Sequence, residues 1–521
     1  MSNLNRLVVV EHLLTIVELI AVVVAVSAVA HRFGLLSPIL LVVVGLALAF
    51  VPGFPVPALD PELILVGVIP PLLYVAAVET SVPAFKYNLR AILWLAVGLV
   101  LFTAAAIGLV VHWLLPTAPL AICFALGAAV APTDAVAATA LAKTIGLPQR
   151  TITILEGESL VNDATALVIF RVAVAAATGS AVGAVGIGQT VLVSAGGGIL
   201  VGVLGALIFG QLHKWTSSPL IDNSLSLLTP FAVMIAAEEV HASGFVAVVV
   251  TGLALGHRWP TLMSAASRLQ MGAFWRMVRF LLEGMIFLVL GLQLRAVVSD
   301  LNTHWQTVLL LTAAVLITLV VTRFAWVMPG VYLSHAPLSS GAVMSWAGMR
   351  GVITLATALA LPLTEDTTSG YPRELFIWLA FAVIVGTFVG QGLTLPAFAR
   401  WVKPPMDDPM QEVLAEAAVQ HTASAAARAK LDELSPSAPD QVVQRLRALT
   451  ESRNNVAWER LGRGRETPSQ AYVRLRREMV NAEREVFRVA RDEGRISEAV
   501  LVRAQRDLDL EESLLERTDE E

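Results

Sequence analysis

The chain has 521 residues, of which 56% are hydrophobic and 15% charged, and its formal net charge at pH 7 is −5. A soluble globular protein of this length does not reach that apolar share, so the composition predicts an all-α polytopic protein embedded in the lipid bilayer. A single cysteine, Cys123, excludes an intramolecular disulfide and a cysteine-built metal site, and the acidic net charge gives no reason to expect a nucleic-acid partner.

The membrane-spanning segments come first along the chain. One bilayer crossing takes about 17 to 25 mostly apolar residues, and the sequence before the tail contains about thirteen segments of this kind. They cover residues 8–30, 36–52, 62–80, 90–113, 118–142, 151–177, 185–211, 224–239, 243–256, 272–297, 305–333, 339–362 and 374–401.

Basic residues set the expected orientation of these spans. They lie mainly in alternate connections, and the positive-inside bias then places the N-terminus outside and the tail in the cytoplasm, as expected for a plasma-membrane protein. Arg6 and the apolar run after it resemble a signal peptide, but Glu11 and Glu18 within the run favour a retained span. The residues on the predicted cytoplasmic side are Arg32, Lys86, Arg90, Lys143, Arg150, Lys214, Arg258, Arg268, Arg400 and Lys403.

Thirteen spans divide into two six-span units and one linking span, so the two units have inverted topology. In transporters with such inverted repeats, discontinuous helices at matching positions flank the ion site. The fifth span carries A-P-T-D-A-V-A (131–137), and the twelfth, its predicted partner, carries G-M-R-G-V-I-T (348–354). Both segments fall where the symmetry requires an interruption.

The residues within these two segments explain why the helices should break. Pro132 removes a backbone donor, and Gly348 and Gly351 loosen the chain, so each span is expected to divide into half-helices. Asp134 beside a positive half-helix end and Arg350 beside a negative one are the stabilising arrangements. The alternative is that Pro132 only kinks a packed helix, which Thr133 caps.

The sixth span carries polar side chains in two columns. Residues four apart share a helix face, which places Ser159 beside Asp163 and Glu158 beside Asn162. A carboxylate inside a membrane span costs about 2.5 to 3.5 kcal/mol and usually marks an ion or proton path. The oxygens of Ser159 and Asp163 suit a hard cation such as Na⁺, and Thr133 could complete the set with its hydroxyl or carbonyl oxygen.

The second column needs a cationic partner for its buried glutamate. Arg323 in the eleventh span is the best candidate for Glu158, and the pair would be structural. The alternative for both columns is a polar seam that holds neighbouring helices together.

The segments A-P-T-D-A-V-A, E-G-E-S-L-V-N-D-A-T-A-L-V and G-M-R-G-V-I-T-L-A, in this order, resemble sodium/proton exchangers of the monovalent cation:proton antiporter superfamily, in the bacterial NhaP/NHE-like branch. The resemblance covers about residues 1–400. It implies a homodimer whose core and dimerisation domains move against each other. It also implies that Asp163 is the transport carboxylate, surrounded by Thr133, Asp134, Glu158, Ser159, Asn162, Arg323 and Arg350.

The third span departs from the family pattern. Val75 stands where many relatives have an acidic residue, and Glu79 is expected to lie too near the membrane interface to replace it. No second carboxylate is therefore expected from this span.

A single carboxylate suffices for a mechanism without a cofactor or an enzymatic step. A bound cation lowers the proton affinity of Asp163 by direct charge interaction, so the two ligands exclude each other. Because the amide of Asn162 cannot titrate, we expect electroneutral one-for-one exchange of Na⁺ or Li⁺ for H⁺, serving pH and sodium homeostasis. Two alternatives remain: an antiporter of this fold that prefers K⁺ or another monovalent cation, and a channel or membrane sensor gated by the buried acids.

The tail has a different composition and forms a predicted second domain. Pro404 and Pro405 separate a transmembrane exchange domain (1–403) from a cytoplasmic helical domain (404–521). A capping box at 467–470, a stop and restart at Gly494 and Ser497, and two apolar stripes predict a helical hairpin. The stripes comprise Tyr472, Leu475, Met479, Ala482, Val486 and Val489, then Leu501, Ala504, Leu508 and Leu515.

The role of this second domain stays open between a solubilising tail and a regulatory or dimer-contact module. The tail sequence contains no nucleotide-binding glycine loop, metal-ligand cluster or nucleophile constellation, so an enzymatic domain is not expected.

Overall fold

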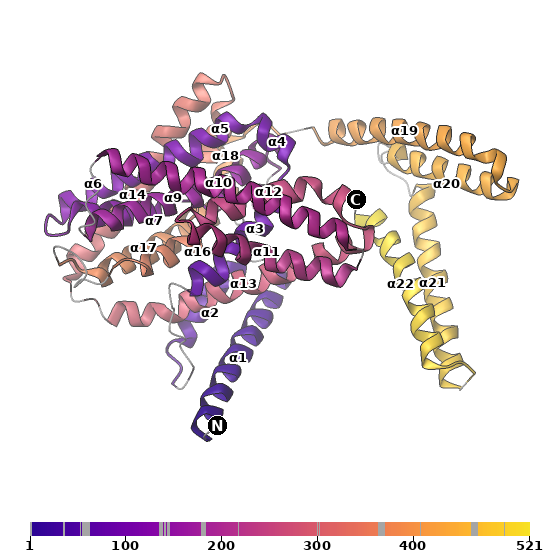
Figure 1. Ribbon diagram of the computed structural model, residues 1–521, viewed down its shortest axis with the longest axis horizontal. Helices are drawn as coiled ribbons and strands as arrows, with labels where there is room; N and C mark the ends of the chain where they lie inside the picture. Colours follow the sequence, from indigo (N-terminus) through magenta and orange to yellow (C-terminus); the bar gives the residue numbers. More distant parts are fainter. Residues whose placement is uncertain are drawn as a thin grey trace. The chain divides into compact units, whose positions relative to one another are not determined.

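The protein is helical and divides into two compact units. A computed structural model describes residues 3–34, 37–52, 54, 63–134, 139, 142, 146–178, 184–216, 218–299, 301, 303–362, 370–406, 408–459, 467–493 and 495–520, and all regular structure in these stretches is helical (Figure 1). The units are Met1–Met406 and Asp407–Glu521. This boundary lies within a few residues of the one predicted from the proline pair.

The first unit contains helix in each of the predicted spans. Its elements are α1 (Asn3–Phe33), α2 (Ser37–Leu48), η1 (Leu63–Val68), α3 (Ile69–Glu79), α4 (Val82–Tyr87), α5 (Leu89–Leu93), η2 (Trp94–Leu99), α6 (Val100–Leu114), α7 (Leu120–Val130), α9 (Gln149–Ala177), α10 (Ala184–Trp215), α11 (Pro219–Glu239), α12 (Gly244–Leu262), α13 (Ala265–Ser299), α14 (Trp305–Leu333), α15 (Leu338–Trp346), α16 (Val352–Leu359), α17 (Arg373–Thr387), η4 (Phe388–Gly392) and α18 (Leu393–Val402).

Nine helical segments of the described chain are long and apolar enough to cross a membrane. The apolar segments at Ser37–Leu48, Ile64–Glu79 and Leu120–Val130 are shorter than a full crossing. The all-α membrane architecture is therefore confirmed, whereas the number of thirteen crossings stays a prediction.

Small residues set how closely the helices of the first unit approach. A Cβ on Gly45 of α2 would lie 2.2 Å from the Leu288 carbonyl oxygen of α13, and one on Gly291 of α13 would lie 2.2 Å from the Val42 carbonyl oxygen of α2. These two helices thus meet backbone to backbone. Such contacts let dispersion forces hold helices together where the surrounding lipid is as apolar as the side chains.

Two interrupted helices meet in the interior of the first unit. Helix α7 ends at Val130, and α15 ends at Trp346 with α16 beginning only at Val352. The backbone N–H of Asp134 donates to the carbonyl oxygen of Met349 at 2.8 Å, so the two non-helical segments contact each other directly. Both predicted interruptions are present. Residues 135–137, which complete the predicted A-P-T-D-A-V-A motif, lie outside the described residues.

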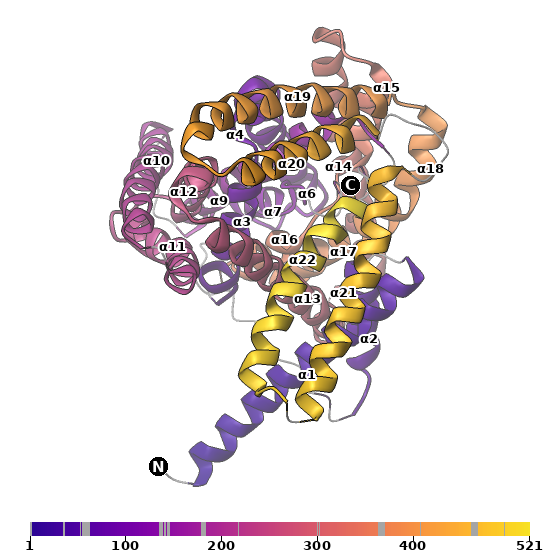
Figure 2. The same cartoon turned by 90° about the vertical axis from the view of Figure 1, so that its right-hand side faces the viewer.

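The second unit consists of two helical hairpins. Helices α19 (Pro409–Leu434) and α20 (Asp440–Glu459) form the first, and α21 (Pro468–Asp492) and α22 (Glu498–Glu520) lie side by side in the second (Figure 2). The predicted capping box starts α21, because the Thr467 hydroxyl accepts from the Gln470 backbone at 3.2 Å and the Gln470 side chain accepts from the Thr467 backbone at 3.0 Å. Gly494, predicted to stop the helix, lies outside the described residues.

The apolar stripe predicted for α21 does not form the hairpin contact. Tyr472, Leu475 and Met479 are each more than half exposed, whereas Val473 and Val480 are buried. Helix α21 carries apolar residues on two neighbouring faces, and apolar spacing alone does not choose between them. Ion pairs between the helices accompany the second face: Arg476 pairs with Glu511 at 2.7 Å and Arg484 pairs with Glu512 at 2.5 Å.

Candidate functional site

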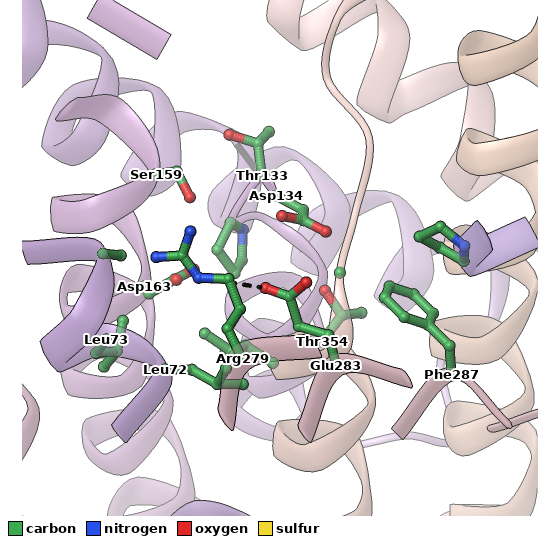
Figure 3. Close-up of a pocket in the computed structure, with 15 residues that line it drawn as sticks. Leu72, Leu73, Thr133, Asp134, Ser159, Asp163, Arg279, Glu283, Phe287 and Thr354 are labelled. Carbon is green, nitrogen blue, oxygen red and sulfur yellow. Dashed lines mark ion pairs between the residues drawn. The ribbon is translucent and has the colours of Figure 1, made fainter. Parts of the chain in front are cut away.

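A cavity of about 110 Å³ lies where α3, α9 and α13 face the two interrupted segments (Figure 3). Asp163 and Ser159 enter it from α9, Thr133 and Asp134 from the first interruption, and Glu283 from α13. The cavity thus brings together carboxyl and hydroxyl groups from segments more than one hundred residues apart in sequence.

The two polar columns of α9 face different surroundings. Ser159 and Asp163 line the cavity, and Asp163 is only 8% exposed. Glu158 and Asn162 are each 1% exposed and point into the helix packing beside it. As predicted from the spacing of four residues, one column of α9 lines the cavity and the other lies in the packing between helices.

Thr133 ties the first interruption to α9. Its hydroxyl donates to Oε1 of Glu158 at 3.0 Å and accepts from Nδ2 of Asn162 at 3.0 Å, and Nδ2 also lies 3.3 Å from the Thr133 carbonyl oxygen. A hydroxyl oxygen has two lone pairs, so one remains for a further ligand. Thr133 both holds the broken chain in place and presents oxygen to the cavity.

The predicted ion pair between Glu158 and Arg323 is present. It is bidentate, with nitrogen–oxygen distances of 2.6 and 3.0 Å, and Nε of Arg323 donates to the Met344 carbonyl oxygen at 3.1 Å. Each residue is 1% exposed. Parallel bonds of this kind satisfy both charges where no solvent reaches them. The pair joins α9 to α14 and to the end of α15.

Arg350 lies at the carbonyl end of α7. Its Nε donates to the Val130 carbonyl oxygen at 3.1 Å, and its terminal nitrogens donate to the carbonyl oxygens of Gly348 and Ala131. A cation at this position satisfies carbonyls that the broken helix leaves unpaired and stabilises the negative end of its dipole. This is the role expected of Arg350 from the sequence.

Asp134 occupies the complementary position at the second interruption. Gly351, the residue before α16, approaches it so closely that a Cβ on Gly351 would lie 2.8 Å from Oδ2 of Asp134. The carboxylate therefore lies beside the positive end of α16. Each interrupted segment thus supplies the charge that stabilises the half-helix of the other.

The structure adds two cavity residues from α13 that the sequence analysis missed. Arg279 and Glu283 line the cavity, and Arg279 lies 2.8 Å from Glu79 and 4.0 Å from Glu283 (Figure 3). Glu79 is therefore connected to the cavity through Arg279, although it was set aside as interfacial. Charged residues four apart within the predicted tenth span were the available signal.

As expected, α3 contributes no carboxyl group to the cavity wall: its lining residues are Leu72, Leu73 and Ala76, and Val75 is buried without lining the cavity. A further carboxyl group reaches the cavity nonetheless, from Glu283 of the tenth span. Thr354 of α16 also lines the cavity, and its Oγ1 is a buried oxygen with no hydrogen-bond partner in the part of the chain described. It is a potential cation ligand that the sequence analysis did not assign.

The chain is similar to several known proteins. Residues 19–401 match the family model described as sodium/hydrogen exchanger, transmembrane. The chain is 37% identical over 416 residues to an uncharacterised Na⁺/H⁺ exchanger of Mycobacterium tuberculosis, covering 76% of this chain and 75% of the relative. It is 31% identical to the low-affinity Na⁺/H⁺ antiporter NhaS1 of Synechocystis, covering 78% of this chain and 77% of that one.

Two further similarities bear on cation choice and on fold. The sodium, potassium, lithium and rubidium/H⁺ antiporter of Bacillus pumilus is 32% identical, with 75% of this chain and 62% of the relative covered. The solved structure of the sodium proton antiporter MjNhaP1 from Methanocaldococcus jannaschii superposes with a TM-score of 0.60 at 19% identity, covering 76% of this chain and 98% of that one. At that identity the similarity shows a shared fold.

Proposed function

Because the chain belongs to the sodium/hydrogen exchanger family of membrane transporters, we propose that it exchanges Na⁺ for H⁺ at the cavity beside Asp163. The single observation that carries this assignment is the convergence of Asp163 and Ser159 with the two interrupted segments. Helix breaks inside a membrane protein persist where their ends line a polar site.

The oxygen atoms around the cavity suit a monovalent cation. Asp163 supplies the charge, and Ser159, Thr133 and Thr354 offer hydroxyl oxygens, the ligand type that hard cations prefer. Glu158, Asn162 and Arg323 hold Thr133 in position, while Asp134 and Arg350 stabilise the broken helix ends. In this scheme Na⁺ is cargo, and no resident cofactor takes part.

Exchange follows from the double use of one carboxylate. A proton and a cation both neutralise Asp163, and each opposes binding of the other. If the binding site changes sides only when it is neutralised, each cycle carries one ion in each direction. We propose electroneutral one-for-one exchange. Glu283, at the cavity wall, would then keep the same charge throughout the cycle.

The cation that the protein prefers is less closely specified than the exchange itself, because K⁺ could use the same oxygen ligands. A relative named for sodium, potassium, lithium and rubidium shares 32% identity with this chain, and oxygen ligands alone do not specify ionic radius. We propose Na⁺ and Li⁺ as the preferred ions, with K⁺ as the competing assignment. We further propose that the protein lies in the plasma membrane as a homodimer, with its N-terminus outside and its tail in the cytoplasm.

Proteoliposomes loaded with a pH-sensitive dye test the assignment. Added Na⁺ should raise the pH of an acidic lumen along a saturable curve that protons compete with, and the initial rate should not change with imposed membrane potential. Parallel runs with Li⁺ and K⁺ rank the cations. Unsaturable flux driven by voltage would indicate a channel instead, and net charge movement would exclude electroneutral exchange.

Two matched variants locate the chemistry. Asp163→Asn should reduce exchange to the level of empty liposomes, because an amide can neither hold the proton nor balance a cation. Asp222→Asn is the control, since Asp222 is a fully buried carboxyl group outside the cavity that pairs with His213 at 2.8 Å. Folded Asp163→Asn protein that exchanges ions like the parent would refute the proposal.

A further inference from the structure

A second cavity, of about 660 Å³, lies apart from the first and shares none of its lining residues. It is bounded by α5 and η2, the start of α9, the end of α14 and the start of α15. Three apolar segments long enough to cross a membrane begin or end there, namely 89–114, 149–177 and 305–333. The cavity therefore lies at one surface of the membrane.

The polar part of this cavity is basic. Arg90 and Arg150 line it, no acidic residue does, and neither arginine has an ion-pair partner in the described ranges. Nε of Arg150 donates to Oδ1 of Asn88 at 3.2 Å, and Asn88 is anchored in turn by a 3.0 Å bond to the Ala84 carbonyl oxygen. One guanidinium is thus oriented by the fold, and its remaining donors are available to an anion.

The rest of the wall is mostly apolar. Leu95, Ile154, Val327 and Met344 form one hydrophobic cluster along it. The wall also contains small residues, namely Ala91, Gly330, Ser334, Ala336, Ser340 and Gly341. Two of them let other wall side chains pack closely, because a Cβ on Gly330 would lie 2.9 Å from Trp94 and one on Gly341 would lie 2.9 Å from Val331.

A half-exposed aromatic side chain forms part of the cavity wall. Trp94 lines the cavity and is 47% exposed. Its ring stacks on Trp326 with centroids 4.6 Å apart and packs so close to Gly330 that a Cβ there would lie 2.9 Å from its Nε1. Tryptophan at this depth is typical of the membrane–water interface, where its ring contacts acyl chains and its N–H meets polar groups.

We propose that this cavity binds one anionic phospholipid, with the phosphate between Arg90 and Arg150 and an acyl chain along the apolar wall. The two arginines are opposite in charge to a phosphate and can donate parallel hydrogen bonds to it, and basic pockets between membrane helices are suited to acidic headgroups. A soluble phosphate would leave the apolar wall without a partner, which is why the combination favours a lipid. The bound lipid joins the start of α9 to α14 and α15, the helices that carry Asp163, Arg323 and the second interruption.

Binding can be measured on the purified full-length protein. Native mass spectrometry after addition of phosphatidylglycerol, or of phosphatidylcholine with the same chains, should show one retained phosphatidylglycerol and at least about tenfold weaker retention of phosphatidylcholine. Thermal unfolding should shift upward with phosphatidylglycerol in a concentration-dependent way, because a ligand of the folded state stabilises it. Equal retention of the two lipids by the unaltered protein would overturn the proposal without any variant.

Variants measure separately how much the basic residues and the apolar wall contribute to lipid binding. The double variant Arg90→Gln/Arg150→Gln should bind phosphatidylglycerol at least about tenfold more weakly. Ala91→Phe, which fills the cavity without changing its charge, should weaken binding similarly. The control Lys214→Gln/Arg258→Gln removes two basic residues that do not line the cavity and should retain the lipid. Parent-like binding by the first double variant would refute the site.

Inorganic phosphate distinguishes the two sources of the anion. It should give no thermal shift at concentrations where phosphatidylglycerol gives its full effect. A phosphate shift as large as that of the lipid, lost in Arg90→Gln/Arg150→Gln, would show a small-anion site and overturn the assignment to a lipid.

Discussion

Removing Arg323 is the sharpest test of how the site is held together. The Glu158 carboxylate accepts two guanidinium bonds of 2.6 and 3.0 Å and one hydroxyl bond from Thr133 at 3.0 Å, and it is 1% exposed. In Arg323→Met only the hydroxyl bond remains. Breaking a buried ion pair from one side costs about 3 to 5 kcal/mol.

The loss can be measured as a free energy of unfolding in mixed micelles, with increasing dodecyl sulfate and tryptophan fluorescence as the signal. Glu158→Met/Arg323→Met removes both charges and should lose less stability than Arg323→Met alone, because no buried charge is left unpaired. Arg276→Met, an exposed arginine of α13, should change stability by no more than about 0.5 kcal/mol. A cost below about 1 kcal/mol for Arg323→Met, or a double variant less stable than the single one, would contradict a stabilising role for this ion pair.

Three further outcomes follow from the structure. Gly351→Ala should slow ion exchange about tenfold, because its Cβ would lie 2.8 Å from the Asp134 carboxylate and overpacking costs at least about 1 kcal/mol. The control Gly390→Ala, whose Cβ would meet nothing within 4 Å, should exchange ions like the parent in the same liposome assay. Glu283→Gln should raise the KM for Na⁺ about fivefold with little change in maximal rate, because the loss of its negative charge at the cavity wall weakens the attraction of the cation by about 1 kcal/mol. An unchanged KM would show that Glu283 takes no part in cation binding. In the tail, hydrogen bonds from Arg476 hold the pKa of Glu511 below its ordinary value. The contact therefore stabilises the pairing of α21 with α22 at pH values above the unfolded pKa near 4.3, and this stabilisation is lost as the pH falls through the folded pKa. The protection of backbone amides in these helices against hydrogen–deuterium exchange should drop in acid, and it should drop less in Glu511→Gln.

Local sequence was sufficient for the helical membrane class and for several of the residues that line the cavity. Spans are visible because a crossing needs a long apolar run, and a carboxylate within such a run is costly enough to mark a functional position. The spacing of four residues along α9 assigned Asp163 and Ser159 to one face, because helix periodicity is a local property. The interruptions after Val130 and Trp346 were likewise visible as proline and glycine beside charged residues.

Contacts between distant segments were decided only by the tertiary structure. The charges of Arg279 and Glu283 mark one face of their span, but only the packing of α13 places that face at the cavity beside Asp163. The same holds for α21, where two apolar faces compete and packing against α22 buries Val473 rather than Tyr472. Helix period is set within one turn, whereas the partner of each face depends on how the whole chain packs, and that information is spread over residues far apart in sequence.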